Sequence, residues 1–561
     1  MSTSARRGVW QFAFLTFVSA VGLYRLCLPV TYSGDDLQYA VVIERSVHGG
    51  LFYHPAGGQP YVPQAAQRAV ELPPTLPAVN PRYLLEWPTS AFVARLWSGA
   101  GLAGDAVAAI QAYRIVVSAL GLTLFFLAMA RLVRSPALAL LPTSGLGVAA
   151  AYFTYSTHMD QSINMVTLLV LAFYLFVRQN ESAPTTGGRA LLACVLAGAT
   201  FYNFTAALSA LAFGVGVALE SPDTSIAGRT RRFVGFGLGY TLIVGVVITT
   251  AVAVFVSPAS VTDPAYWRGV TFGGRPEYDV DVAVDAVRAA IGLAKSQTHF
   301  PGLAGDVALA FQAASAARQA LLLAFFAAVL LILMLPFGAL AARLRRPWTK
   351  RSMFLFLVAW LTAHGLFNGF WDPGFNKYWL VPLVACWAVA ALALAELRQH
   401  RPRLYRPALL GTLTFVLVSF GVNLSTQFWP QSHAAGNPWM QVARDLRTAS
   451  RPADLFISRR HPLDFYLSYF SRRDVVSTWL VAYDRGGDAT GLKERLAERM
   501  AAHRADGGKV YAYGLEELTP AERTAQRTLL GNPPLREAWR YPGATTFYEI
   551  TDGSRMTPAA P

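Results

Sequence analysis

Two adjacent carboxylates, Asp35 and Asp36, follow directly on the first long apolar run of the chain, within the sequence TYSGDDLQYA (31–40). That run, at about residues 9–30, is long enough to cross a bilayer, so the two acids stand where the chain leaves the membrane. Carboxylates at such a boundary are either solvated loop residues or parts of a site that handles protons or cations. They are therefore the first candidates for catalysis.

Two short polar segments between later apolar runs are also dense in groups that could contact a substrate. Their candidate residues are His158, Asp160, His364, Asp372, Asn376, Lys377 and Tyr378. Polar groups at membrane depth are costly, and they usually face a cavity or one another. A structural alternative stays open for three of them: His158 and Asp160 could form a packed pair, and Lys377 could be a lysine that snorkels from a helix end.

The composition identifies the environment in which these residues must work. Of 561 residues, 54% are hydrophobic and only 14% are charged, and the mean hydropathy is +0.35. A soluble protein of this size carries more charge and fewer long apolar runs, so we expect a polytopic α-helical membrane protein. The first run is too long for the apolar region of a secretion signal, and we expect it to be retained as a helix.

Apolar runs of membrane-spanning length predict about eleven transmembrane helices. They lie near residues 9–30, 108–131, 136–155, 160–178, 190–204, 206–220, 233–256, 319–341, 353–371, 378–397 and 408–426. The three cysteines all fall inside such runs. This placement predicts neither a disulfide framework nor a cysteine metal site.

The net charge of +15 has a simple topological explanation. Basic residues gather in alternate gaps between the apolar runs, and the other gaps are nearly free of them. The clusters are Arg131 and Arg134; Arg178 and Arg189; Arg229, Arg231 and Arg232; Arg343, Arg345, Arg346, Lys350 and Arg351; and Arg398, Arg401, Arg403 and Arg406. This is the positive-inside pattern, which explains the basicity without a nucleic-acid partner.

The same pattern divides the chain into a membrane core and extracytoplasmic parts. With the N-terminus inside, the polar gaps 31–107 and 257–318 fall outside, and the first is expected to hold helices lying in the membrane interface. Residues 1–429 then form the core, and 430–561 form a soluble extracytoplasmic α/β domain. Its expected strands are DLFIS (454–458), DVVST (474–478) and KVYAYGL (509–515), which alternate with helical stretches near 437–450, 462–470, 490–504 and 520–530.

A site on the outer face has no access to cytosolic ATP or nucleotide sugars, so an activated substrate must arrive within the membrane. Polyprenyl-phosphate sugars are donors of this kind. Glycosyl transfer from them needs a carboxylate that takes the proton of the acceptor hydroxyl. It also needs cationic or amide groups that stabilise the departing phosphate, and an apolar groove for the prenyl chain.

At this point the chain resembles the GT-C superfamily of integral membrane glycosyltransferases. This superfamily includes protein O-mannosyltransferases, the bacterial aminoarabinose transferase and mycobacterial arabinofuranosyltransferases. The layout of the first 430 residues carries the resemblance, together with GDDLQYA (34–40), which is similar to the D-[DE]-x-x-Y pattern of the family. NPRYLLEWP (80–88) and NKYWLVPL (376–383) add weaker matches. The family usually has Glu where Asp36 stands, and often has His-Pro where this chain has Asn80-Pro81.

The resemblance implies roles for several residues. Asp35 is the expected general base, and Asp36 is expected to bind the acceptor or to position the base. Lys377 corresponds to a cation that meets the lipid phosphate, with Tyr378 and Arg82 as weaker companions. His158, Asp160, His364, Asp372 and Asn376 are further candidates for substrate or acceptor contact.

The expected function is glycosyl transfer from a polyprenyl-phosphate donor to a glycan, lipid or protein acceptor at a bacterial inner (plasma) membrane, with the site on the periplasmic or extracellular side. No cofactor is assigned, although the two acids with His158 or Asp160 could hold Mg²⁺ or Mn²⁺. Two other classes stay open. A transporter or lipid flippase would use intramembrane acids as a proton relay and would show inverted repeats. A non-catalytic envelope assembly protein would depend on residues 430–561 and not on Asp35.

Overall fold

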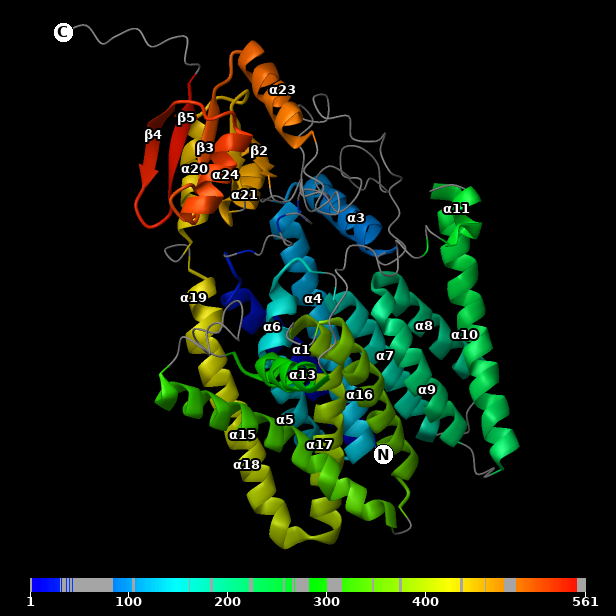
Figure 1. The fold of residues 1–561 in the computed structure, drawn as a ribbon. Coiled ribbons are helices and arrows are strands. Elements are labelled where there is room, and N and C mark those ends of the chain that lie inside the picture. Colours follow the sequence, from blue (N-terminus) through cyan, green and yellow to red (C-terminus); the bar gives the residue numbers. More distant parts are fainter. Residues whose placement is uncertain are drawn as a thin grey trace, which may run out of the picture.

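The computed structural model shows a helical core with a small sheet at one end (Figure 1). Most of residues 31–83 and much of residues 256–314 lie outside the described part of the chain. The structure describes residues 3–30, 32, 37, 40, 43, 84–102, 106–160, 162–181, 185–220, 225–255, 258–264, 267, 282–299, 315–345, 348–372, 376–433, 437–459, 461–478 and 491–551.

Every one of the eleven predicted apolar runs coincides with helix. The helices are α1 (Thr3–Leu26), α4 (Ala106–Val133), α5 (Pro136–Gly147) followed by α6 (Ala150–Thr157), α7 (Ser162–Glu181), α8 (Thr186–Tyr202), α9 (Ala207–Leu219), α10 (Ile226–Phe255), α15 (Ala316–Ala341), α16 (Arg351–Trp371), α17 (Leu380–His400) and α18 (Pro402–Asn423). Short 3₁₀ turns precede two of them, η3 (Phe204–Ala206) before α9 and η5 (Asn376–Trp379) before α17, and η4 (Ala342–Arg345) follows α15. A π-turn, η6 (Leu424–Phe428), and α19 (Trp429–Gln431) extend α18.

Within the described residues, eight helices are long and apolar enough to cross a membrane, and the bent pair α5–α6 makes up to nine. Helices α8 and α9 are shorter, with 17 and 13 residues. Burial separates central from peripheral spans: 89% of the most apolar window of α17 is buried, against 17% for α10 and 22% for α15 and for α18. The peripheral helices therefore present apolar side chains to lipid, and α17 lies at the centre.

The prediction of one continuous span at 136–155 is wrong in detail, because α5 and α6 are bent by 69° relative to each other. The backbone leaves the helical conformation at Ala149, which is extended. Groups from distant helices bond to carbonyls at the bend: Asn423 donates to Val148 O over 2.8 Å, and Gln297 donates to Gly145 O over 3.4 Å. Tertiary partners thus stabilise a break that an apolar run alone does not reveal.

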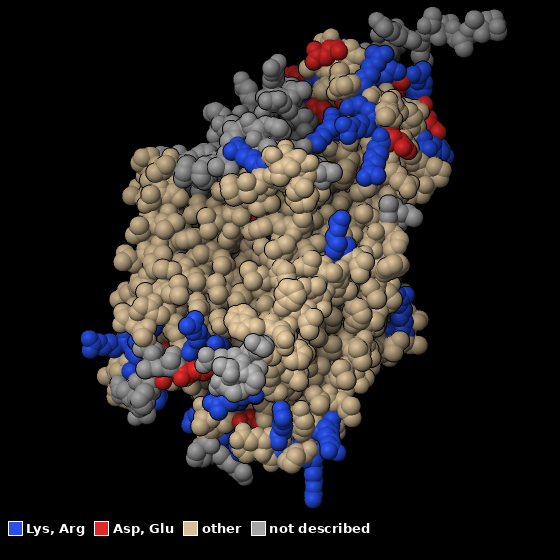
Figure 2. All heavy atoms as spheres, turned by 180° about the vertical axis from the view of Figure 1, so that it is seen from behind, with Lys and Arg blue, Asp and Glu red and all other residues tan. Residues whose placement is uncertain are grey.

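The arginine-rich gaps meet at one end of the core. Contacts join them across the sequence, namely Arg131 to Glu181, Arg189 to Glu220, Arg343 to Glu396 and Arg398 to Ser135. Figure 2 shows basic side chains at this end and a belt nearly free of charge between it and the sheet on the face in view. The segregation of charge matches the alternation seen in the sequence.

The terminal part of the chain forms a five-stranded mixed sheet with the order β2-β1-β3-β5-β4. Its strands are β1 (Leu455–Ser458), β2 (Asp474–Ser477), β3 (Val510–Tyr513), β4 (Leu535–Tyr541) and β5 (Thr545–Ile550). Strand β1 pairs in parallel with β2 and β3, and β5 pairs antiparallel with β3 and β4. The three predicted strands are confirmed. The hairpin β4–β5 was not predicted.

Helices cover both faces of this sheet. They are α20 (Pro438–Ala449), α21 (Leu463–Tyr466) with the π-turn η8 (Leu467–Ser471), α23 (Leu492–Ala505) and α24 (Pro520–Leu529). Alternate residues of β1 separate into two apolar clusters: Leu455 and Ile457 pack with residues of α23, and Phe456 packs with residues of α20 and η8. The cluster that contains Phe456 also contains Val107 and Met159 of the membrane core. The sheet is therefore packed directly onto the core.

Within the described residues, three further helices belong to the predicted outer segments: α3 (Glu86–Gly99), α11 (Pro258–Thr262) and α13 (Val282–Gln297). Helix α13 packs against α6, α15, α16 and α17. Its last turn is buried, because Ser296 and Gln297 are each 0% exposed. Part of the 257–318 segment is thus built into the core.

One test of this packing replaces Gly145 of α5 by Ala. A Cβ atom at this position would overlap the ring of Trp387, whose Nε1 is held by Gln297 over 3.0 Å. We expect Gly145→Ala to destabilise the protein by about 1–3 kcal/mol, as overpacked cores do. Thermal unfolding in detergent measures the loss. Gly338→Ala is the control, since nothing lies within 4 Å of its new Cβ. Equal melting of the two variants would contradict this packing.

Candidate active site

The first polar centre is an ion pair between Asp160, at the α6–α7 junction, and Lys377 of η5. Lys377 Nζ donates to Asp160 Oδ2 over 2.9 Å. The other carboxylate oxygen, Oδ1, accepts from the main-chain N and the hydroxyl of Ser162 over 2.8 and 2.5 Å. Asp160 therefore holds the start of α7 and the lysine at once.

Both members of this pair are buried, with 5% of Asp160 and 7% of Lys377 exposed. Removing two charges from water is costly, and only close pairing with additional hydrogen bonds compensates for it. The Lys377 ammonium group is thus bound inside the protein and does not extend to solvent. Asp160 bonds to Lys377, so the alternative of a packed pair with His158 does not describe it.

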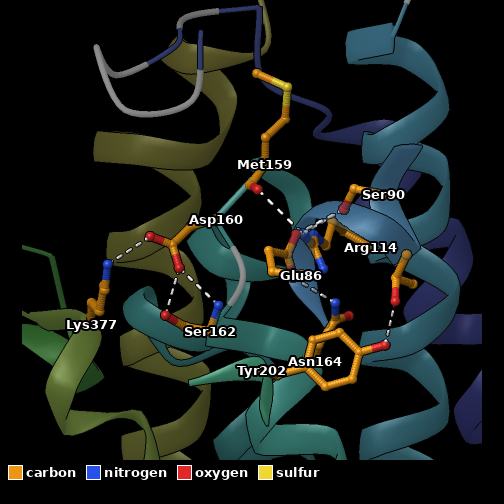
Figure 3. A network of polar contacts seen from close by, with 10 residues as sticks. Glu86, Ser90, Arg114, Met159, Asp160, Ser162, Asn164, Tyr202 and Lys377 are labelled. Atoms are coloured by element: carbon orange, nitrogen blue, oxygen red, sulfur yellow. Dashed lines mark hydrogen bonds and ion pairs between the residues drawn. The ribbon is translucent and has the colours of Figure 1, made fainter. Parts of the chain in front are cut away.

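A second buried ion pair lies beside the first, between Glu86 of α3 and Arg114 of α4. Glu86 Oε1 also accepts from Ser90 Oγ over 2.8 Å, and Oε2 accepts from Asn164 Nδ2 over 3.0 Å. Arg114 is 0% exposed and additionally donates to Met159 O over 3.4 Å. Met159 precedes Asp160 in the chain, so the two pairs share one stretch of backbone (Figure 3).

The position of α3 across the end of the core sets the place of Glu86. Leu85 N donates to Phe201 O over 2.9 Å, which joins the start of α3 to the end of α8. One turn along, the hydroxyls of Thr89 and Tyr202 are 2.9 Å apart and hydrogen-bonded. Helices α3, α4, α7 and α8 thus converge on one polar centre (Figure 3).

Two further predicted residues lie at the same end of the core. Asn376 Oδ1 accepts from the Tyr155 hydroxyl over 3.0 Å. The Tyr378 hydroxyl accepts from Trp371 Nε1 over 3.2 Å, and its main-chain O accepts from Asn368 over 2.8 Å. These contacts fix η5, the turn that carries Lys377.

The remaining predicted residues are not all in this centre. His364 is buried between α16 and α9, where Nε2 lies 2.8 Å from Ser209 Oγ. His158 is buried at the end of α6, and its N donates to Thr154 O over 2.9 Å. Asp372 follows α16 and is half-buried. Asp35, Asp36 and Arg82 lie outside the described residues.

Sequence reasoning missed Glu86 and Arg114 as candidates. A signal existed for Arg114, because it stands inside the predicted apolar span 108–131, where an ionisable group usually has a functional or structural partner. Glu86 lies within the NPRYLLEWP segment, but nothing in the sequence pairs it with Arg114.

Two buried cations and two buried carboxylates at one end of a membrane core can serve several purposes. The cations can meet an anionic group such as a phosphate, and a carboxylate can accept a proton. Within the described ranges no group of three or more His, Cys, Asp or Glu residues is arranged to hold a metal ion. The expectation of Mg²⁺ or Mn²⁺ with Asp35 and Asp36 falls on residues outside those ranges.

The sequence matches no protein-family model and no curated protein. Solved structures do resemble it. ArnT from Cupriavidus metallidurans, an aminoarabinose transferase, matches in its apo state with a TM-score of 0.60 at 13% identity, over 97% of this chain and 98% of ArnT. The same protein bound to undecaprenyl phosphate matches with a TM-score of 0.56 at 14% identity, over 99% of each chain.

The oligosaccharyltransferase from Archaeoglobus fulgidus, in a complex with Zn and sulfate, gives a TM-score of 0.54 at 13% identity, over 95% of this chain and 73% of that protein. The chain has the GT-C fold. The resemblance inferred from the residue pattern is thereby confirmed at the level of fold. In this chain, α3, α4, α7 and η5 contribute residues to the two ion pairs and their hydrogen bonds.

The ion pair between Asp160 and Lys377 can be tested by removing one of its charges and then both. Lys377→Met leaves the Asp160 carboxylate buried without its cation, so we expect a loss of stability of about 3–5 kcal/mol. Asp160→Asn combined with Lys377→Met removes both charges, and the amide oxygen can still accept from Ser162. We expect most of the stability to return.

Thermal unfolding in detergent compares Lys377→Met, the double variant and wild type. A Lys377→Met protein that melts like wild type would contradict a buried, paired lysine. So would a double variant no more stable than Lys377→Met.

Proposed function

We propose that the protein is a membrane glycosyltransferase that moves a sugar from a polyprenyl-phosphate donor to an acceptor hydroxyl. The observation that carries the proposal is Lys377, a buried cation paired with Asp160 at one end of a GT-C core. A membrane protein keeps an ionised pair in such a place at a cost, and a site that meets an anionic substrate explains why it is kept.

The proposed reaction is a single displacement with inversion. The acceptor oxygen attacks the anomeric carbon, its proton passes to the Asp35 carboxylate, and the bond from the anomeric carbon to the phosphate oxygen breaks. Asp36 binds the acceptor or positions Asp35. The electron pair of the broken bond stays on the lipid phosphate, which leaves as the polyprenyl phosphate.

Cations near the phosphate stabilise the charge that develops on it. Lys377 takes this role in the proposal, and Arg114 is the proposed second cation, since it donates to Met159 O next to Asp160. Tyr378 and Arg82 are proposed companions. The ArnT structure that contains undecaprenyl phosphate supports a polyprenyl carrier as the donor lipid. A divalent cation has no proposed role in this scheme.

The proposed orientation places the site on the periplasmic or extracellular side of a bacterial inner membrane. The arginine-rich gaps gather at the opposite end from the terminal sheet, as expected if that end faces the cytoplasm. The acceptor is then a hydroxyl of a cell-envelope glycan or lipid. Residues 430–561 form the proposed extracytoplasmic domain above residues 1–429, with His158, Asp372 and Asn376 as candidates for acceptor contact.

The direct test replaces the proposed base. Asp35→Asn keeps the shape of the side chain but cannot accept the proton, so we expect transfer to fall by about 10²–10⁴-fold. The assay incubates purified protein with undecaprenyl-phosphate sugars and envelope extract, and follows released undecaprenyl phosphate by mass spectrometry. This product forms whatever the acceptor is.

Asp445→Asn is the matched control, because Asp445 is an exposed carboxylate of α20. Undiminished release by folded Asp35→Asn protein would remove the assignment of the base. If deletion of residues 430–561 abolished function while Asp35→Asn had no effect, an assembly role would replace catalysis.

A further inference from the structure

The terminal α/β part holds the chain just before the acidic pair through one phenol. Tyr32 N donates to the Tyr466 hydroxyl over 2.7 Å, and that hydroxyl donates to Tyr32 O over 2.9 Å. A single side chain of α21 therefore satisfies both main-chain groups of Tyr32. Tyr466 itself is 3% exposed, so water does not compete for these bonds.

A second anchor acts two residues earlier. Asn437 Nδ2 donates to Val30 O over 2.7 Å and to the Tyr466 hydroxyl over 3.3 Å, while Val30 N donates to Gln431 O over 2.8 Å. Asn437 is 1% exposed and is the N-cap of α20, where its Oδ1 accepts from Met440 N over 3.2 Å. The helices that cover the sheet thus fix the direction in which the chain leaves α1.

The chain is anchored to the same part again after the acidic pair. Leu37, Ala40 and Ile43 are 0%, 0% and 1% exposed, and they belong to the apolar cluster that contains Tyr466 and the sheet residue Phe456. Only four residues, 33–36, separate the anchor at Tyr32 from the anchor at Leu37. Asp35 and Asp36 are two of them.

We propose that Tyr466 and Asn437 are positioning residues, through which the terminal α/β part sets the place of the acidic pair. This inference rests on the proposed function for its catalytic consequence, because Asp35 is the proposed base there. The anchoring itself does not depend on that proposal. The terminal part then contributes to the reaction rate without touching the reacting atoms.

The expected consequence follows from the sensitivity of transfer reactions to geometry. A general base must lie within hydrogen-bond reach of the proton that it takes. A displacement of about 1 Å costs on the order of 10²-fold in rate. Loss of the main-chain anchors should therefore reduce kcat and leave binding of the donor lipid unchanged, because Lys377 and Arg114 lie on other elements.

Two substitutions remove the anchors and keep the surrounding packing. Tyr466→Phe deletes the hydroxyl and retains the ring, which packs against Phe470 at a centroid distance of 6.0 Å. Asn437→Ser retains an oxygen that can cap α20 but is too short to reach Val30 O. Tyr511→Phe is the control: Tyr511 is a buried residue of β3, and its hydroxyl makes no hydrogen bond with any part of the chain that the structure describes.

Three measurements on the whole protein test the anchoring and the positioning role of Tyr466 and Asn437. Hydrogen exchange of the peptide covering residues 30–43 reports the anchoring, kcat for release of undecaprenyl phosphate reports the rate, and titration with undecaprenyl phosphate reports donor-lipid binding. We expect faster exchange and a kcat about tenfold or more below wild type in Tyr466→Phe and Asn437→Ser. The dissociation constant should stay unchanged, and Tyr511→Phe should match wild type in all three.

Unchanged exchange in Tyr466→Phe would overturn the anchoring, whatever the protein catalyses. Faster exchange with an unchanged kcat would overturn the positioning role. A parallel loss of kcat and donor-lipid affinity would also overturn it, since that pattern indicates general damage. If wild type released no undecaprenyl phosphate, the proposed function would fail, and the exchange data alone would still accept or reject the anchor.

Discussion

Two pairs of opposite charges are buried in the membrane core, at the end next to the terminal sheet. The structure of that end depends on keeping these charges paired. Asp160 and Lys377, and beside them Glu86 and Arg114, are almost fully buried. Each carboxylate accepts hydrogen bonds in addition to its ion pair. Removing such charges from water is unfavourable, and close pairing with further hydrogen bonds compensates for it only where several elements converge with the right geometry. Helix α3, the α6–α7 junction and the turn η5 carry the residues that form these pairs.

The same end of the core is where the terminal sheet is attached. One apolar cluster includes Val107 of α4, Met159 beside the ion pairs and the sheet residues Phe456 and Phe547. A flexibly tethered module would not share its interior with the membrane core in this way. The attachment also includes side-chain hydrogen bonds from Asn437 and Tyr466 to the main chain of residues 30 and 32, so the terminal part also holds the chain where it leaves α1.

Local patterns in the sequence predicted what local forces determine. Apolar runs predicted α1, α4 to α10 and α15 to α18, and short apolar strands predicted β1, β2 and β3. Such patterns could not predict contacts between residues that are far apart in the sequence. Lys377 and Asp160 are 217 residues apart, and no periodicity pairs them. The break between α5 and α6 depends on Asn423 and Gln297. Glu86 becomes a candidate only once the structure shows its ion pair with Arg114. The candidate centre was thus predicted in part, from η5 and the α6–α7 junction.

In the proposed function, the two buried cations Lys377 and Arg114 receive the phosphate of a membrane-borne sugar carrier. Electron cryomicroscopy of the protein in lipid nanodiscs containing undecaprenyl phosphate tests it most directly. The account predicts phosphate density within hydrogen-bond distance of Lys377 Nζ or the Arg114 guanidinium, with the prenyl chain running between helices toward lipid. Phosphate bound at the arginine-rich end of the core, or no bound carrier at saturating lipid, would contradict it.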